Sequence, residues 1–113
     1  MIKVMNIISD TNIGGAGRVL LNYVKYCNRD EFEISVALPR GSALVPRLKE
    51  SGVKILELDM EGDRSFDRAA IPVLNEIINR EKPDIVHTHG SLSGRIAARR
   101  SGRHVIYTRH CAF

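Results

Sequence analysis

The stretch IKVMNIISDTNIGGAGR, residues 2–18, decides the fold class of this chain. Its opening residues are mostly apolar and partly β-branched, which predicts a buried strand at 2–8. Three glycines follow, and beyond them apolar residues recur at helical spacing: Val19, Leu20, Tyr23, Val24 and Cys27. A strand that runs through glycines into a helix is typical of an α/β fold.

The rest of the chain repeats this alternation. Apolar runs at 32–38, 53–58, 84–88 and 104–108 predict further strands, and helical spacing occurs between them around Leu48, Ile78 and Ile96. Gly52 and Gly102 are placed to end helices, and we expect the third helix to begin at Pro72, because an interior proline loses a hydrogen bond. The pattern predicts a Rossmann-like, doubly wound parallel sheet of about five strands in one domain, residues 1–113.

Composition agrees with one compact globular domain, with 113 residues, 43% hydrophobic and 27% charged. No apolar run approaches the roughly 20 residues of a membrane span, and the opening lacks the flanks of a signal peptide. We therefore expect a cytoplasmic protein in which Cys27 and Cys111 are reduced thiols.

Charge is distributed unevenly along the chain. The net charge is +4, and no acidic residue follows Asp84, whereas these arginines do: Arg95, Arg99, Arg100, Arg103 and Arg109. Such a stretch can meet phosphates or anionic lipid, so a peripheral contact with the inner face of a membrane stays open. Aromatic residues do not interleave with these arginines as in single-strand binders, and no nucleic acid partner is expected.

Ligands of doubly wound sheets bind at the carboxyl ends of the strands, which here are followed by loops 9–17, 39–42, 59–65, 88–91 and 109 onward. Within the first loop, Gly14, Gly15 and Gly17 let the backbone approach an anion closely, next to the positive end of a helix and Arg18. A dinucleotide fingerprint is excluded because Leu20 occupies its closing position. The alternative is a tight turn whose glycines serve packing alone.

The segment EGDRS at 61–65 resembles a long mobile loop.

Histidines mark two of the other loops. His87 and His89 share one face of the fourth strand, and His110 follows the fifth. The His-x-His spacing can hold a metal ion, but no clear carboxylate or thiolate completes the set, and packing against a helix is the alternative. A neutral imidazole at His110 can donate to a sugar hydroxyl or phosphate oxygen, and a lone surface histidine is the competing interpretation.

Three motifs in order, IGGAGR, KPDIVHTHGS and TRH, together resemble glycosyltransferase family 4, and the resemblance covers essentially the whole chain. It implies a GT-B fold with two Rossmann-like domains, of which this chain would be an incomplete first, acceptor-side domain without the donor-binding C-terminal domain. It implies transfer of a hexosyl unit from a nucleotide sugar to the hydroxyl of a carbohydrate or lipid-linked acceptor, with retention and without a metal or other cofactor.

The resemblance also assigns residues. The three loop glycines would lie near the donor pyrophosphate and the transferred sugar, Arg18 near anionic groups, His89 and Gly90 on the acceptor side, and His110 at the reacting sugar as the catalytic residue. The isolated chain is expected to be inactive, and an uncovered strand or sheet face to favour self-association.

Two other functions remain open on sequence alone. A phospho-acceptor receiver domain has a similar length, and Asp10 and Asp59 end strands, but Arg109 stands where its lysine is expected. A non-catalytic nucleotide-binding or phosphate-binding module would use the same glycine loop for affinity alone.

Overall fold

The computed structural model describes residues 1–108 of the chain. Strands and helices alternate strictly, in the order β1 (Ile2–Ile8), α1 (Gly15–Tyr26), β2 (Phe32–Pro39), α2 (Leu44–Glu50), β3 (Lys54–Leu58), α3 (Ala70–Glu81), β4 (Ile85–His89), α4 (Leu92–Arg100) and β5 (His104–Thr108). All five predicted strands and the four predicted helices are present in this range, with strand boundaries within one residue of the expected ones.

The strands form one parallel sheet in the order β3-β2-β1-β4-β5. The chain therefore starts in the middle, builds outward to β3, and then crosses over β2 and β1 to continue at β4. This is the doubly wound, Rossmann-like arrangement that the sequence predicts. It excludes the receiver alternative, because in that fold the third strand lies beside the first, whereas here β4 does.

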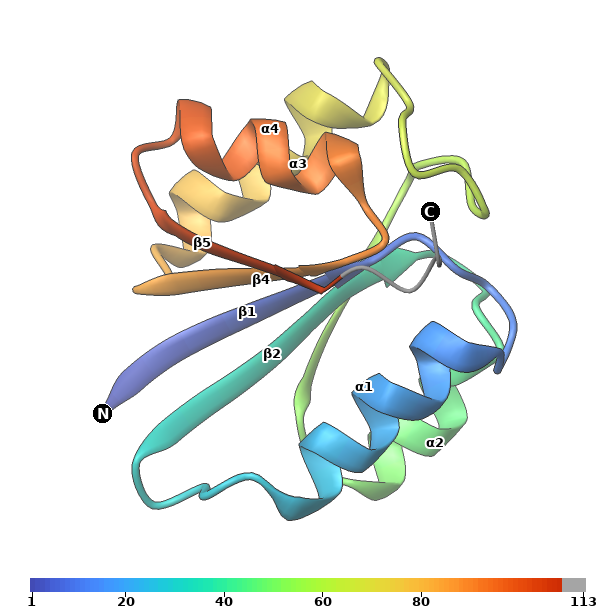
Figure 1. Cartoon of the computed structure of the whole chain (residues 1–113), viewed down its shortest axis with the longest axis vertical. Helices are drawn as coiled ribbons and strands as arrows, with labels where there is room; N and C mark the ends of the chain where they lie inside the picture. The colour runs from blue at the N-terminus through green and yellow to red at the C-terminus, as the bar shows by residue number, and fades with distance from the viewer. Residues whose placement is uncertain (109–113) are drawn as a thin grey trace.

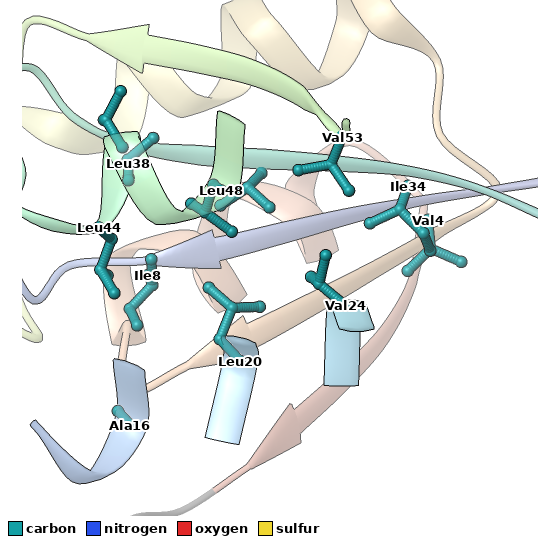
Figure 2. Packing of buried hydrophobic residues seen from close by; sticks show 12 residues of the cluster. Val4, Ile8, Ala16, Leu20, Val24, Ile34, Leu38, Leu44, Leu48 and Val53 are labelled. Carbon is teal, nitrogen blue, oxygen red and sulfur yellow. The ribbon is translucent and has the colours of Figure 1, made fainter. Parts of the chain in front are cut away.

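Helices cover both faces of the sheet (Figure 1), with α1 and α2 on one side and α3 and α4 on the other. On the first side, side chains from β1, β2, α1 and α2 point into a shared core (Figure 2), among them Ile8, Leu20 and Leu48, which are fully buried. On the other side, Met5, Leu74 and Val86 belong to a second core beneath α3 and α4. Alternation along β1 separates the two sets, since Val4 and Ile8 face one core and Met5 and Ile7 the other.

Helix ends follow the local rules, with one correction. Gly52 and Gly102 have positive φ values of 74° and 71° just beyond α2 and α4, as predicted for helix-ending residues. The predicted start of the third helix at Pro72 is wrong, because α3 begins at Ala70. Pro72 lies in the first turn, where a backbone N–H has no intrahelical partner, and its missing donor costs nothing there.

Candidate functional site

The parallel register brings the carboxyl ends of the strands to one edge of the sheet. Ile8 is paired with His89, and His89 with Thr108, so the loops after β1 and β4 and the end of β5 lie at this same edge. The loop after β2 joins them, since the amide of Ala43 donates to the carbonyl of Thr11 over 2.8 Å. The topology thus assembles the glycine-bearing and histidine-bearing turns that the sequence singles out.

The glycine loop, defined as residues 9–15, leads from β1 into α1. Gly14 is the N-cap of α1, and no side chain caps this helix end. Gly14 and Gly15 are exposed, have no positive φ, and would meet nothing within 4 Å if they carried a Cβ atom. Neither a positive φ nor internal packing therefore requires glycine at these two positions, and the space beside them is open to solvent.

Gly17 differs from the other two glycines. It is buried, and an added Cβ would lie 3.0 Å from Cδ2 of Leu44 and 3.3 Å from the carbonyl oxygen of Asn12. This glycine serves the close packing of α1 against α2, beneath the loop surface. Arg18, the next residue, is exposed on the first turn of α1.

The two histidines of β4 stack on each other on the α1 side of the sheet, with ring centroids 4.1 Å apart. His89 is 1% exposed, and its Nε2 lies 3.0 Å from Oδ1 of Asn6. His87 meets the ring of Tyr23 edge to face, and its Nε2 lies 2.7 Å from Oγ1 of Thr108. The pair thereby links β1, β4, β5 and α1 just below the carboxyl edge.

Gly90 and the start of α4 follow these histidines. Gly90 is exposed with a φ of 64°, which allows the chain to turn sharply from β4 into α4. The hydroxyl of Ser91 then caps α4 by accepting from the amide of Gly94 over 3.1 Å. Two residues further along, the hydroxyl of Ser93 accepts from the amide of Asp67 over 2.6 Å and anchors the long loop after β3.

That long loop makes a contact that sequence reasoning missed. Asp63 accepts two hydrogen bonds from Thr11 in the glycine loop, from the amide at 2.9 Å and from the hydroxyl at 2.6 Å. Its own amide donates to the carbonyl of Ser9 over 2.8 Å. The two bonds from Thr11 hold the pKa of the Asp63 carboxyl below its ordinary value, with the Thr11 hydroxyl as the largest cause. The segment 61–65, expected to be a mobile loop, is thus tied to the first loop at its centre.

The structure places the predicted site residues unequally. Gly14, Gly15, Arg18 and Gly90 are exposed, whereas Gly17 and His89 are buried below the surface. His110 lies outside the described residues, although β5 delivers Thr108 to the proposed edge. Within residues 1–108, no cluster of three or more His, Cys, Asp or Glu side chains is arranged to hold a metal ion.

None of the described helices has the length and apolar character needed to cross a membrane.

Several charged side chains near the carboxyl ends of the strands form ion pairs, as Arg40 does with Asp59 at 2.9 Å on the surface. Such exposed pairs add little stability.

Solved structures with this fold include several glycosyltransferases. MurG of Acinetobacter baumannii is 20% identical with a TM-score of 0.74, and the match covers 95% of this chain and 34% of that one. A glycosyltransferase of Rickettsia africae is 19% identical with a TM-score of 0.75, covering 99% and 30%. HepE of Anabaena, solved with UDP and glucose, is 18% identical with a TM-score of 0.71, covering 98% and 30%.

These likenesses confirm the Rossmann-like fold expected for the first domain of a GT-B glycosyltransferase, and the chain spans about a third of the length of the structures it matches. No curated protein matches the sequence. Residues 13–113 match the family model described as Glycosyltransferase Family 4. Because this match extends over most of the sequence, the chain belongs to glycosyltransferase family 4.

Proposed function

We propose that this chain is the first part of the N-terminal, acceptor-side domain of a GT-B enzyme that transfers a hexosyl unit from a nucleotide sugar to an acceptor hydroxyl. The family match over residues 13–113 supports this function. So does the binding chemistry of the similar structures, since HepE was solved with UDP and glucose and VinC with dTDP.

The observation that carries the proposal is the exposed pair Gly14 and Gly15 at the uncapped start of α1. The free N–H groups and positive dipole end of this helix would face the donor pyrophosphate, with Arg18 adding a full positive charge. Donors fixed in this way stabilise the negative charge that develops on the departing nucleoside diphosphate. Gly17 would act from below by bringing α1 close to its neighbours.

On the other side of the proposed cleft, Gly90 would line the acceptor side. His89, expected to line it as well, is buried, so it would contribute by supporting the turn at Gly90. His110 would act at the reacting sugar as the catalytic residue. In this proposal transfer proceeds with retention. It needs no metal or other cofactor, because fixed backbone donors and arginine would take over the charge of the leaving phosphate.

The isolated chain would be inactive in this proposal, because most of the nucleotide contacts would belong to a second domain across the cleft. Transfer of labelled sugar from UDP-glucose by purified residues 1–113 is expected to be undetectable. Detectable turnover would contradict the assignment of this chain to one half of a bipartite site. The acceptor in this proposal is a carbohydrate or a lipid-linked sugar, met in the cytoplasm or at the inner membrane face.

Binding can be tested on the chain itself with glucose 1-phosphate, which carries both a sugar and a phosphate. We expect amide signals of Gly14, Gly15 and Gly90 to shift in NMR titrations, with glucose alone as the control for the phosphate. Gly15→Ala should weaken binding, since a methyl group would occupy the open space that the phosphate needs. Shifts centred away from this edge would count against the site.

A further inference from the structure

Thr11 is the point at which three loops of the carboxyl edge meet. Its carbonyl accepts from the amide of Ala43 after β2, and its amide and hydroxyl donate to Asp63 after β3. Its methyl group also faces Gly62, where an added Cβ would approach to within 2.3 Å. One residue of the glycine loop is thus fixed from two neighbouring loops at once.

Asp63 itself adopts a left-handed backbone conformation. Its φ of 61° is one that glycine adopts freely and that asparagine and aspartate tolerate better than most other residues. If the chain needed only a turn here, glycine would form it with less strain. A carboxylate that accepts both donors of Thr11 explains why aspartate stands at this exposed position.

The bonds of Thr11 and Asp63 act close to the proposed binding surface. The next carbonyl in the loop, that of Asn12, accepts from the amide of Gly14 over 3.0 Å. Hydrogen bonds and consecutive residues of the loop therefore connect the carboxylate of Asp63 to the backbone of Gly14. Because Thr11 is held in place, the backbone of Gly14 and Gly15 has fewer conformations available to it.

We propose that Thr11 and Asp63 form a latch that holds the glycine loop in its ligand-accepting shape, which makes both of them positioning residues. The effect of the latch on ligand binding rests on the proposed function, because the loop that the latch holds is the one assigned to the phosphate. The effect of the latch on the conformation of the loop can be measured without any ligand.

The test compares Thr11→Val with Thr11→Ser in the full 113-residue chain. Valine keeps the shape and the methyl group but loses the hydroxyl donor, whereas serine keeps the donor. Asp63 retains its negative charge in both variants, so the formal charge beside the glycine loop is the same in each. The NMR order parameters of the amides of Gly14 and Gly15 report the mobility of the loop, and those of Ile7 and Val36 in the central strands report the rigidity of the sheet.

We expect Thr11→Val to lower the order parameters of Gly14 and Gly15 from about 0.85, the value of rigid backbone, to about 0.6, and to leave those of Ile7 and Val36 unchanged. Glucose 1-phosphate should bind this variant several-fold more weakly than the unaltered chain, while Thr11→Ser restores both properties. Unchanged order parameters at Gly14 and Gly15, or lower values at all four amides in parallel, would overturn the latch.

The two proposals fail separately. If Thr11→Val loosens the glycine loop but glucose 1-phosphate shifts no amide of the unaltered chain, the latch is supported and the phosphate site is lost. If glucose 1-phosphate binds the unaltered chain and Thr11→Val with equal affinity and the order parameters of Gly14 and Gly15 are also equal, the site is supported and the latch is refuted.

Discussion

At the scale of single residues, the two kinds of glycine in IGGAGR make a direct comparison possible. Gly17→Ala places a methyl group against Leu44 and the carbonyl of Asn12, and overpacking of this kind should lower the free energy of unfolding by about 1 kcal/mol. Gly15→Ala meets nothing and restricts the unfolded chain, so it should raise that energy by about 0.5 kcal/mol. Urea denaturation measures both, and changes of the same sign would contradict the packing seen here.

The carboxyl of Asp63 gives the loops a pH dependence. Hydrogen bonds from Thr11 hold its pKa below the ordinary value of 3.8, so its contribution to stability is complete above that pH and is lost as the pH falls through the lower folded value. Glu81, paired with Lys54, behaves in the same way below its ordinary value of 4.5. We expect thermal stability to fall below pH 4 and Asp63→Asn to flatten that fall. If Asp63→Asn loses thermal stability below pH 4 as the unaltered chain does, the loss arises from other carboxyl groups.

At the scale of elements, α1 and α4 begin in opposite ways at the same edge. Ser91 caps α4 with its side chain, whereas Gly14 leaves the first amides of α1 without a side-chain partner. Gly14→Ser can adopt the extended conformation present at this position and should stabilise the chain by a few tenths of a kcal/mol. The added hydroxyl would occupy the helix end, so glucose 1-phosphate should bind less tightly although the protein melts at a slightly higher temperature. Tighter binding by this variant would exclude an anion site at α1.

Most elements could be predicted from the sequence because each depends on local chemistry. The apolar runs fix the strands, and glycines such as Gly52 end helices wherever a positive φ is needed. The start of α3 was misplaced by two residues, because the rule for proline allows any position in the first turn.

The candidate site was predictable only in part. Gly14 and Gly15 stand out as a motif, but the different role of Gly17 depends on Leu44, which lies on another helix. The hydrogen bond of Thr11 to Asp63 joins residues 52 positions apart, and the local sequence around either residue does not predict this contact. The Gly-Asp pair at 62 and 63 was the available signal, since such residues favour left-handed turns.

At the scale of the whole molecule, the two edges of the sheet are protected differently. The outer strand β3 carries Lys54 and Glu57, and charged side chains discourage pairing with another sheet. The other outer strand, β5, carries Val105, Ile106 and Tyr107 in its centre, and within residues 1–108 no strand pairs with its outer side. Ile106 is 51% exposed and lies on the face opposite the core contact of Val105.

This asymmetry leads us to expect that the chain associates with a second copy through β5. Light scattering should show a mass that rises with concentration, and Ile106→Lys should return it to that of a monomer, because two lysines would meet across the contact. Phe66→Lys is the matched control, since Phe66 is 48% exposed but lies in the loop after β3. Circular dichroism verifies that both variants fold. If Phe66→Lys alone gives a monomer, the contact lies at the loop after β3 and not at β5. If the unaltered chain is a monomer at every concentration, the side chains of β5 protect this strand sufficiently.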